Sequence, residues 1–413
     1  MDPKNIRISD YSYSLPQDRI AQFPEDKRDN ARLLVLDRGT ISDHRISELD
    51  TILPAGTHLF FNDTRVIHAR LLFRKKSGGW IEVFLLTPEH GEYELTNAMA
   101  SRGSVRWNCL VGGARKWKEE TLAMDVIIKG RSVNLKAVKG RMENGVYHVE
   151  FQWEDAGFSF SEVLDAAGQI PLPPYFNREI LPEDNDRYQT VFARTEGSVA
   201  APTAGLHFTP DLISRLKASG TSVHFLTLHV GAGTFKPVSS ESIGEHSMHS
   251  EYFEADIQLV NQLIEMNGER VVPVGTTSLR SLESLYWLGA KCLQDEFDGE
   301  WEVGQWEGFD SPFNGTMKQS MSALATRMMK EGKTRIKART SLLVAPGYRF
   351  RVATGLVTNF HMPGSTLLLL VAAMAGNHWK NAYVHALARG YRFLSYGDAM
   401  YIASQEMKNV TRG

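Results

Sequence analysis

Histidines are concentrated in one part of the chain. Of the thirteen in the sequence, five lie between positions 207 and 249, namely His207, His224, His229, His246 and His249. Imidazole changes its charge near neutral pH and can accept or donate a proton, so such a cluster is typical of a proton-transfer site. Packing of neutral histidines in a core would explain the same residues. For the group as a whole, proton transfer or hydrogen bonding to a polar ligand is the better explanation.

A metal site is the main alternative for this cluster. His246 and His249 stand three residues apart, with Glu245 and Glu251 on either side. On a helix, both imidazoles would lie on one face and could hold a metal ion together with Glu251. The spacing matches no zinc-hydrolase signature, however, and the chain contains no HExxH. We therefore expect no metal, and a metal-dependent hydrolase that uses His246, His249 and Glu251 is an alternative function.

The residues around this cluster predict short elements that end at glycines. Pro210 and Asp211 suit the first turn of a helix, which Gly220 would end. The run 223–230 is rich in β-branched and large apolar residues and predicts a buried strand. His229 would then lie at the carboxyl end of a strand, which is where α/β proteins bind ligands.

A glycine pair follows this strand. Gly231-Ala232-Gly233 resembles the start of a dinucleotide-binding or methyltransferase loop, but the third glycine is missing. The next four residues, Thr234 to Pro237, cannot begin the helix that such a loop needs. A Rossmann methyltransferase is therefore disfavoured, and the chain has no P-loop, GxSxG elbow or cysteine nucleophile motif.

Two further strand-to-helix junctions carry polar residues. The run 270–274 predicts a strand, followed by Gly275-Thr276-Thr277-Ser278 and a helix through Leu285. Free amides and hydroxyls at such a helix start suit an anion, a carboxylate or a ribose edge, although plain helix capping also explains them. Residues 358–366 precede a third helix over 367–375, which is too short to span a membrane and is expected in the core.

Length and composition indicate a two-domain globular protein. The chain has 413 residues, an ordinary apolar content, and neither a transmembrane segment nor a secretory leader. Its two cysteines, Cys109 and Cys292, offer no disulfide framework and no zinc-type spacing. We therefore expect a cytoplasmic protein without a membrane partner.

The charge is unevenly distributed along the chain. The formal net charge is −2, but Arg65 to Arg141 contains fifteen Lys/Arg and seven Asp/Glu, a balance of +8, so the rest carries −10. A basic face that contacts phosphate would explain this segment. The alternative is that Arg74-Lys75-Lys76 and Arg115-Lys116-Trp117-Lys118 are solvated loops.

The basic segment also differs from its flanks in pattern. Strand-like runs such as 80–86 and 126–128 alternate with glycine turns, which predicts a small barrel or sandwich. We therefore expect an α/β fold, with a mixed α+β body of residues 1–62 and 150–413. A small all-β, barrel-like domain of residues 63–149 would be inserted into this body.

A second irregular segment spans about 286–340. It holds an acidic, Trp-bearing loop over 295–310 and a helix that would end at Gly332. One face of that helix carries Met317, Met321, Leu324 and Met328. Methionine stripes of this kind are more typical of a core or an interface than of a cofactor site.

Longer motifs resemble those of a known family. They are AAPTAGLHFT, TLHVGAGTF, EHSMHSE, VGTTSLRSLES, TNFHMPGSTLLLLVAAMAG, YRFLSYGDAM, YSLPQDRIAQFPEDKRDNARLLVLDR, FNDTRVIHARL, PLPPYFNRE and DRYQTVFA. Together they cover nearly the whole chain and closely resemble the S-adenosylmethionine:tRNA ribosyltransferase-isomerase family of queuosine biosynthesis.

The resemblance implies an unusual use of S-adenosylmethionine, as a ribosyl donor and not a methyl donor. The ribosyl unit passes to the aminomethyl group of 7-aminomethyl-7-deazaguanine in the tRNA wobble position. It is rearranged there to an epoxycyclopentanediol, which gives epoxyqueuosine and releases adenine and methionine. The implied partners are tRNA and S-adenosylmethionine as co-substrate, with no metal or redox cofactor, and we expect a monomer.

Such steps need a base and an acid that titrate near neutrality, which suits histidine. The candidate catalytic residues are His207, His229, His246, His249, Glu251 and Asp398, with no choice among the histidines. The candidate substrate-binding residues are Thr203, Gly205, Gly231, Gly233, Thr234, Thr276, Thr277, Arg280, Asn359, His361 and Tyr396. Arg280 would hold the methionine carboxylate or a phosphate.

Some positions depart from the usual family motifs. Residues 111–119 replace a Ser/Lys/Arg-rich strand end, and Ser247 stands where an arginine is common. TSLLVAPGYRF replaces a run like TDIFIYPGYRF, and the segment 286–340 is longer than the family norm. These departures concern the RNA contacts and the acceptor more than the core site. A tRNA-binding paralogue without catalysis is therefore the second alternative function.

Overall fold

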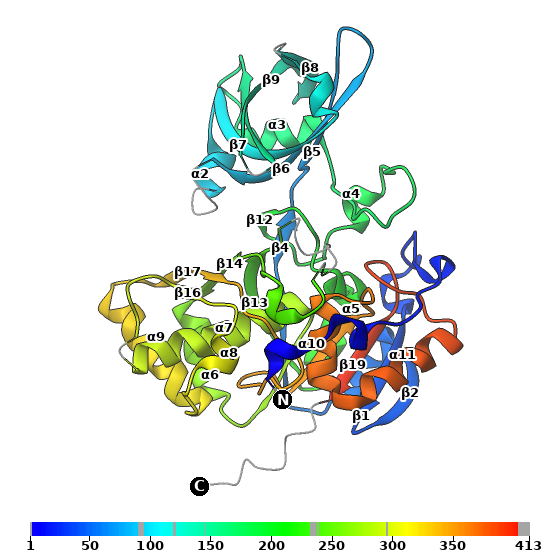
Figure 1. The fold of residues 1–413 in the computed structure, drawn as a ribbon, viewed down its shortest axis with the longest axis vertical. Coiled ribbons are helices and arrows are strands. Elements are labelled where there is room, and N and C mark those ends of the chain that lie inside the picture. The colour runs from blue at the N-terminus through cyan, green and yellow to red at the C-terminus, as the bar shows by residue number, and fades with distance from the viewer. Residues whose placement is uncertain are drawn as a thin grey trace.

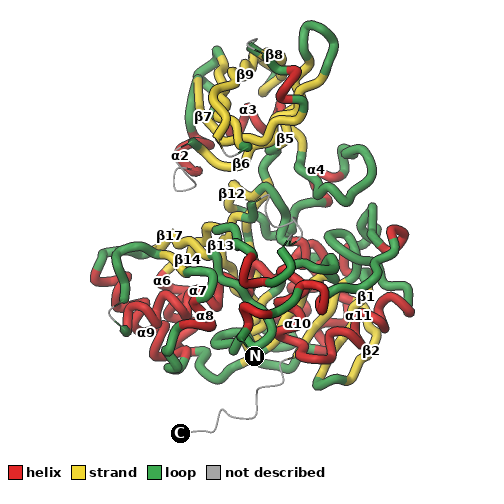
Figure 2. Tube along the Cα trace, viewed as in Figure 1, coloured by secondary structure: helices red, strands yellow, loops and turns green. Residues whose placement is uncertain are grey.

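The protein is a mixed α/β structure with a larger body and a smaller β lobe (Figure 1). The computed structural model describes residues 2–89, 95–118, 121–143, 145–231, 238, 240–294 and 296–403. We call the part built around residues 70–169 the lobe and the remainder the body. Helices lie almost entirely in the body, while strands dominate the lobe (Figure 2).

The body contains two sheets, whose strands come from distant parts of the chain. The six-stranded sheet has the order β15-β3-β13-β14-β17-β16, and the four-stranded sheet has the order β18-β19-β1-β2. Their bounds are β1 Arg32–Asp37, β2 Thr40–Arg45, β3 Thr57–Asn62, β13 Ser222–His229, β14 Glu251–Asp256, β15 Arg270–Pro273, β16 Glu302–Val303, β17 Arg335–Thr340, β18 Gly355–Asn359 and β19 Ala399–Ala403.

The two sheets meet at β15 and β18. A parallel bridge joins Val274 to Val357, and the Gly275 amide donates to the Val357 carbonyl at 2.8 Å. Strands β13 and β15 both pair with β3 in parallel. The carboxyl ends of β13, β3, β15 and β18 therefore meet at one edge of the combined sheet, where α/β proteins bind their ligands.

Helices cover this sheet, and the predicted starts of two of them are confirmed, whereas the predicted end of one is too early. The predicted helix after Thr209 is α5, and the Thr209 side chain accepts from the Leu212 amide at 3.2 Å. The helix after Gly275 is α7, which extends past the predicted end at Leu285 because residues 286–290 are also buried. The helices of the body are α1 Leu49–Ile52, α4 Asp184–Arg187, α5 Pro210–Ala218, α6 Ile257–Glu265, α7 Thr276–Leu293, α8 Glu307–Asp310, α9 Met317–Lys330, α10 Thr366–Ala375 and α11 Trp379–Ala388.

The methionine-bearing helix belongs to the core of the body. Met317, Met321, Leu324 and Met328 of α9 are buried in the same cluster as the apolar face of α7. The two helices approach closely at Gly289, where a Cβ would lie 2.1 Å from the Ser320 carbonyl oxygen. The methionine stripe is therefore core, as the pattern predicted.

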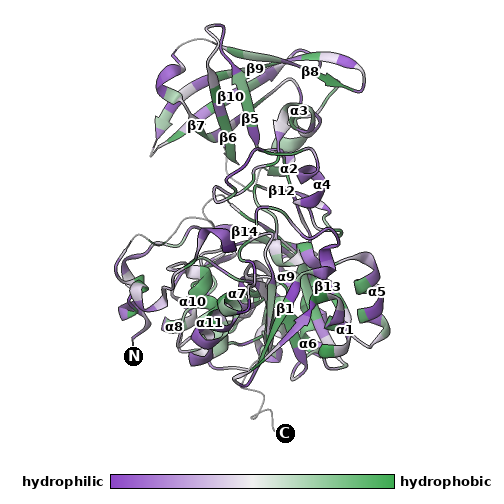
Figure 3. Cartoon of the chain, turned by 90° about the vertical axis from the view of Figure 1, so that its right-hand side faces the viewer, coloured by the Kyte–Doolittle hydropathy of each residue, from purple (hydrophilic) through white to green (hydrophobic). Residues whose placement is uncertain are grey.

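The lobe is a single antiparallel sheet with the strand order β11-β5-β6-β7-β10-β9-β8. Apolar and polar residues alternate along its strands, so one face packs on the lobe's own core (Figure 3). The predicted strand runs 80–86 and 126–128 fall in β6 and β8. The bounds are β5 Arg70–Arg74, β6 Trp80–Pro88, β7 Ser104–Gly112, β8 Leu122–Ile128, β9 Arg131–Glu143, β10 Val146–Trp153 and β11 Gly168–Gln169, with helices α2 Leu95–Ala100 and α3 Phe160–Ala167.

Two short strands connect the lobe to the body. β4 (Thr64–Val66) leaves the carboxyl end of β3 and leads to the lobe, and β12 (Thr195–Ser198) pairs with it in parallel on the way back (Figure 1). The lobe therefore stands above the sheet edge at which β13, β3, β15 and β18 end. Among the helices in the described residues, none combines the length and the apolar character that crossing a membrane requires.

Candidate functional site

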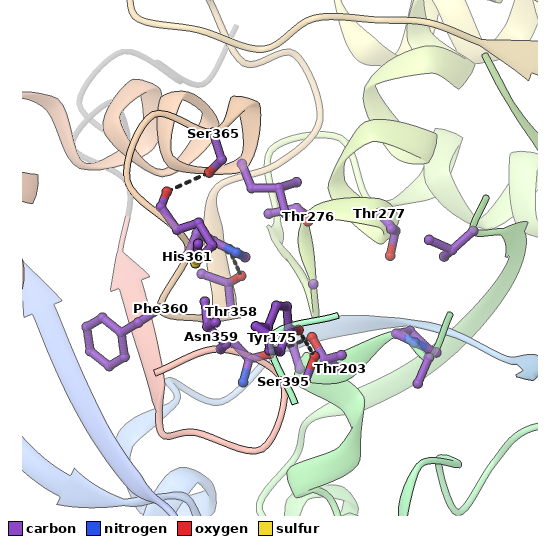
Figure 4. A pocket seen from close by; sticks show the side chains of 18 residues that line it. Tyr175, Thr203, Thr276, Thr277, Thr358, Asn359, Phe360, His361, Ser365 and Ser395 are labelled. Atoms are coloured by element: carbon purple, nitrogen blue, oxygen red, sulfur yellow. Dashed lines mark hydrogen bonds between the residues drawn. The ribbon is translucent and has the colours of Figure 1, made fainter. Parts of the chain in front are cut away.

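A pocket lies at the carboxyl ends of the parallel strands of the body. Its empty volume is about 820 Å³, including the space at its open mouth. Residues after β13, β15 and β18 border it, together with the 3₁₀ segment Thr203–His207 and the loop before β19 (Figure 4). Five of the predicted substrate-binding residues line this larger pocket: Thr203, Thr276, Thr277, Asn359 and His361.

Asn359 organises one wall of the larger pocket. Its Oδ1 accepts a hydrogen bond from the Thr203 hydroxyl at 2.9 Å, and its Nδ2 donates to Nε2 of His207 at 3.1 Å. Because Asn359 ends β18 while the other two belong to the 3₁₀ segment, the amide ties two distant parts of the chain together. Burial lowers the pKa of His207 to about 4, so its imidazole is neutral and accepts this bond.

His361 lies on the same wall as Asn359, in the loop that follows β18. Its Nε2 is hydrogen-bonded to the Thr358 hydroxyl at 2.9 Å, and its amide donates to the Tyr383 hydroxyl at 3.1 Å. The side chain is only 8% exposed, and burial lowers its pKa to about 3. His361 is therefore a neutral hydrogen-bonding group and not a titrating base.

The opposite wall is the amino-terminal end of α7. Gly275 has a φ of 92°, a backbone conformation that glycine adopts without strain and that turns the chain directly from β15 into the helix. No side chain caps this end of α7, and Thr276 and Thr277 place their side chains at the larger pocket (Figure 4). The positive end of an eighteen-residue helix and two hydroxyls thus face the same space.

A smaller pocket of about 320 Å³ adjoins the larger one, and Leu367 borders both. Apolar residues form most of its wall, and Arg280 of α7 and His249 supply its polar groups. The Arg280 Nη1 forms an ion pair with Glu251, and its Nε donates to the Leu342 carbonyl at 3.2 Å. Within the described residues, its buried Nη2 has no hydrogen-bond partner. A buried guanidinium nitrogen that lacks a partner is suited to bind a carboxylate or another small anion.

His249 and Glu251 form a histidine–carboxylate pair beside Arg280. The His249 Nε2 lies 3.3 Å from the Glu251 Oε1, while the other carboxylate oxygen contacts Arg280. Glu251 is buried at the start of β14, and His249 remains about one-third exposed. A carboxylate that holds one nitrogen of an imidazole orients the ring and stabilises its charged form.

The remaining candidate histidines lie apart from both pockets. The Nδ1 of His229 is 3.2 Å from the Thr64 hydroxyl, and burial lowers the pKa of His229 to about 4. The shared helix face that the metal alternative would need is absent, because the 3₁₀ turn Ile243–Glu245 ends before His246 and the described residues 246–250 are not helical. Gln305 holds this segment irregular, since its side chain donates to the His246 carbonyl at 2.7 Å and accepts from the Met248 amide at 2.9 Å.

Four further candidates also lie outside the two pockets. The Asp398 carboxylate accepts from the amides of Arg32 and Arg392, each at 2.8 Å, and the Tyr396 hydroxyl donates to Asp184 at 3.2 Å. A Cβ on Gly205 would lie 3.0 Å from both Phe192 and Thr190, so close packing explains this glycine. Gly231 has open space where a Cβ would stand. Gly233 and Thr234 lie outside the described residues.

Comparison with known proteins adds a second line of information. A family model described as "Queuosine biosynthesis protein" matches residues 8–402 of the chain. The chain belongs to this family. We therefore interpret the fold and the two pockets, including the Arg280–Glu251–His249 group, as those of a queuosine biosynthesis protein.

Two curated relatives are similar over almost their whole length. Both are named S-adenosylmethionine:tRNA ribosyltransferase-isomerase. The protein of Azoarcus sp. (strain BH72) is 38% identical over 404 residues, which cover 97% of this chain and 99% of the relative. The protein of Syntrophotalea carbinolica is 40% identical over 403 residues, covering 96% of this chain and all of the relative. The solved S-adenosylmethionine tRNA ribosyltransferase of Thermotoga maritima is 28% identical, covers 95% of this chain, and superposes with a TM-score of 0.45.

Two residues of this queuosine biosynthesis protein border the larger pocket although no role was predicted for them. The hydroxyls of Tyr175 and Ser395 are hydrogen-bonded to each other at the pocket wall (Figure 4). Both belong to motifs that carry the family resemblance, PLPPYFNRE and YRFLSYGDAM. Membership of these motifs was the signal that could have identified the two residues. They were missed because neither is adjacent to a predicted catalytic residue in the sequence.

The metal-dependent alternative is not favoured for this family member. Among the described residues, no group of three or more His, Cys, Asp or Glu side chains is arranged to hold a metal ion. Of the three proposed ligands, Glu251 is engaged by Arg280, and His246 borders neither pocket. The hydrolase would need these three residues to converge on one point.

Proposed function

We propose that this protein is an S-adenosylmethionine:tRNA ribosyltransferase-isomerase. It transfers the ribosyl moiety of S-adenosylmethionine to 7-aminomethyl-7-deazaguanine in tRNA and isomerises it, which gives epoxyqueuosine-tRNA with release of adenine and methionine. Near-full-length similarity to two relatives of that name supports this activity. The structural observation that carries it is the adjacency of a hydroxyl-lined pocket to a buried arginine whose Nη2 has no partner among the described residues.

The chemistry places clear demands on the site. The sulfonium of S-adenosylmethionine makes the neighbouring 5′ carbon acidic, so a base can remove a proton there, and the resulting carbanion bonds to the anomeric carbon as adenine leaves. The aminomethyl nitrogen of the acceptor then displaces the ring oxygen from the anomeric carbon. That oxygen finally displaces methionine from the 5′ carbon and closes the epoxide. The site therefore needs one proton-transfer group, contacts to the ribose hydroxyls, and a partner for the methionine carboxylate.

His249 is the residue that we assign to proton transfer. Among the four candidate histidines, it alone borders one of the two pockets described above. Glu251 holds its Nε2, and this carboxylate is itself fixed by Arg280. A carboxylate in this position stabilises the imidazolium that forms when the ring accepts a proton. His207 and His229, whose pKa values are each lowered to about 4 by burial, are poorly suited to accept a proton at neutral pH and serve as hydrogen-bonding groups.

Arg280 is the residue that we assign to the methionine carboxylate. Its Nη2 is buried with no partner among the described residues, and leaving such a group unpaired is costly in free energy. A carboxylate placed there would form a charge-assisted hydrogen bond. The apolar wall, which includes Leu342, Leu367 and Leu370, suits the methylene chain and sulfur of the methionyl group.

The adenosyl part of the donor fits the larger pocket. Thr276 and Thr277 at the start of α7 can contact ribose hydroxyls, as can Thr203 and Asn359 on the opposite wall. His361 offers a neutral imidazole to the base or the ribose. With the shared residue Leu367 between the two pockets, the sulfonium would lie at their junction, next to His249.

The domain organisation and the setting complete the proposal. We propose that the module predicted over residues 63–149, extended through β10, α3 and β11 to about residue 169, is a barrel-like insertion into the body, with residues 286–340 as an added segment of the body. The enzyme would act as a monomer in the cytoplasm, where its tRNA substrate is found. The steps above need no metal or redox cofactor, because S-adenosylmethionine is consumed as a co-substrate.

Adenine release tests the proposed activity directly. S-adenosylmethionine is incubated with the protein, with and without tRNA that carries 7-aminomethyl-7-deazaguanine, and the nucleosides are then analysed by mass. We expect adenine in the presence of this tRNA, in a one-to-one ratio with the epoxyqueuosine formed. Binding of tRNA without any adenine release would instead support the non-catalytic paralogue.

A further inference from the structure

A group of basic residues lies at the outer end of the lobe. It combines the turn between β5 and β6 with the 3₁₀ turn Ala114–Lys116 that follows β7. The Lys75 ammonium donates to the Lys116 carbonyl, so the two turns are in direct contact. We call this group the basic tip; it consists of Arg74, Lys75, Lys76, Arg115, Lys116 and Lys118.

Most of these cations lack an acidic partner. Within the described part of the chain, no carboxylate lies within ion-pair distance (4.0 Å) of Arg74, Lys76, Arg115, Lys116 or Lys118, and all five side chains are exposed. The next two residues in the sequence, Glu119 and Glu120, fall outside the described residues. Clustered like charges repel one another, so an unpaired group of this size is suited to a polyanion.

Most other cations of the lobe have carboxylate partners, while Arg102 and Lys139 donate to backbone carbonyls instead. Lys129 lies 2.6 Å from Glu162, Lys136 lies 2.8 Å from Glu154, and Arg131 lies 3.6 Å from Asp155. Arg70 and Arg106 also have carboxylate partners. The positive excess of the segment from Arg65 to Arg141 is therefore concentrated at the basic tip and is not spread evenly over the lobe.

An exposed aromatic ring accompanies the basic tip. Trp80 is 60% exposed and stands directly opposite Arg74 across the β5–β6 pair. The guanidinium of Arg74 lies 5.9 Å from the centre of the indole ring. A flat aromatic surface beside cations is typical of surfaces that bind nucleic acid, because it can contact bases or sugars while the cations contact phosphates.

The position of the lobe relates the basic tip to the pockets. β4 leaves the sheet edge at which the larger pocket lies and leads to the lobe, and the basic tip lies at the end of the lobe farthest from the body (Figure 1, Figure 3). A nucleic acid with one nucleotide at the mouth of the larger pocket, beside the bound donor, could therefore continue along the lobe towards the basic tip.

We propose that the basic tip binds the phosphate backbone of the tRNA at a distance from the nucleotide that is modified. The inference rests on the proposed function, in which a tRNA nucleotide must reach the anomeric carbon of the donor bound in the body. Contacts between cations and phosphates are independent of sequence and strengthen binding in proportion to the counterions that they release. The basic tip thus contributes affinity for RNA, while the pocket selects the nucleotide.

Two triple variants of equal charge test this proposal. The first, Lys76→Gln/Arg115→Gln/Lys116→Gln, removes unpaired cations of the basic tip. The second, Lys129→Gln/Arg131→Gln/Lys136→Gln, removes paired cations elsewhere on the lobe and serves as the control. Binding of full-length tRNA is measured by filter retention from 50 to 300 mM salt, and the KM for tRNA is measured by adenine release.

We expect the first variant to raise the Kd and the KM for tRNA about tenfold at 150 mM salt. It should also reduce the slope of log Kd against log salt by about 2 to 3, because each lost phosphate contact changes the slope by about 1. The control variant should keep the wild-type slope and KM. Equal slopes in all three proteins, or an equal loss in both variants, would overturn the inference.

The two proposals fail in different ways. If the wild-type protein releases adenine on tRNA but the first variant binds tRNA like the wild type, the basic tip has no role in binding and the proposed function stands. If the wild type releases no adenine but its tRNA binding depends on the basic tip, the proposed function fails and the inference stands.

Discussion

The polar side chains of the larger pocket and those of the basic tip differ in burial and in pairing. Around the pocket, Asn359, His207 and His361 are buried and have hydrogen-bond partners within the protein. At the basic tip, Lys76, Arg115 and Lys116 are exposed, with no ion-pair partner in the part of the chain that the structure describes. The two regions are therefore suited to different kinds of ligand contact.

Burial makes the contacts of the pocket short-range and dependent on geometry. Electrostatic interactions are stronger where water is excluded, and fixed donors and acceptors need not reorganise during a reaction. Exposed cations act over a longer range, tolerate variation in the position of the partner and weaken with salt. The body is thus suited to chemistry on one nucleotide, and the basic tip to the charge of a whole RNA.

The largest expected effect concerns the proton-transfer group of the body. Replacing His249 by Ala should reduce the rate of tRNA-dependent adenine release by about 10²- to 10⁴-fold, which is the usual contribution of a general base. Adenine release under single-turnover conditions measures this rate.

His246→Ala provides the comparison for this variant. His246 stands three residues earlier but borders neither pocket, so most of the activity should remain. If His246→Ala lost as much activity as His249→Ala, the assignment of the base would be wrong. Wild-type turnover in His249→Ala would remove His249 from the mechanism.

The buried histidines of the body make its stability dependent on pH. Burial lowers the pKa of His207 from 6.5 to about 4, so the unfolded chain binds this proton more readily than the folded chain. The stabilisation is complete above pH 6.5 and is lost as the pH falls from 6.5 towards 4, by roughly 3 kcal/mol for this residue.

Hydrogen exchange read by mass spectrometry can locate this effect. Between pH 6.5 and 4, the body should lose protection more than the lobe, because no histidine of the lobe within the described residues is fully buried. His207→Gln should lessen the loss in the body. An equal loss of protection in body and lobe would contradict the claim that buried histidines make the stability of the body dependent on pH.

Substitutions of Arg280 and Arg335 compare the effect of changing a buried cation with that of changing an exposed one. Arg280→Lys should raise the KM for S-adenosylmethionine about 10- to 30-fold, because a single ammonium cannot serve Glu251 and the methionine carboxylate in the same geometry. Arg335→Lys is the matched control, since Arg335 pairs with Glu254 but has a largely exposed side chain. Steady-state adenine release at varied S-adenosylmethionine measures both. A similar KM in the two variants would argue against a carboxylate at Arg280.

The smallest expected effect concerns the paired surface cations of the lobe. Lys129→Gln should change the free energy of unfolding by less than about 1 kcal/mol, because ion pairs in contact with solvent contribute little. Urea denaturation followed by tryptophan fluorescence would measure the change. A loss well above this value would mean that the Lys129–Glu162 pair, and not only apolar packing, holds α3 on the lobe.

Local features of the fold were predictable from the sequence. Thr209 and Pro210 mark the start of α5, and the alternation of apolar residues marks β6, because both signals depend on neighbours a few positions away. Family motifs also indicated the pocket residues Thr276 and Asn359. The helix over His246 and His249 that the metal alternative would need does not form, and Gln305, far away in the sequence, contacts that irregular segment.

Most helices and strands, the family, and most residues able to do the chemistry could be predicted from the sequence. Which of these residues lie together follows from the three-dimensional fold. Asn359 meets His207 across 152 positions, and Arg280 meets Glu251 across 29. Such contacts depend on which strands pair and which side chains lose water, and neither is encoded in local spacing. The same holds for the basic tip, where two turns that are distant in the sequence are in contact and five cations have no acidic partner within the described residues.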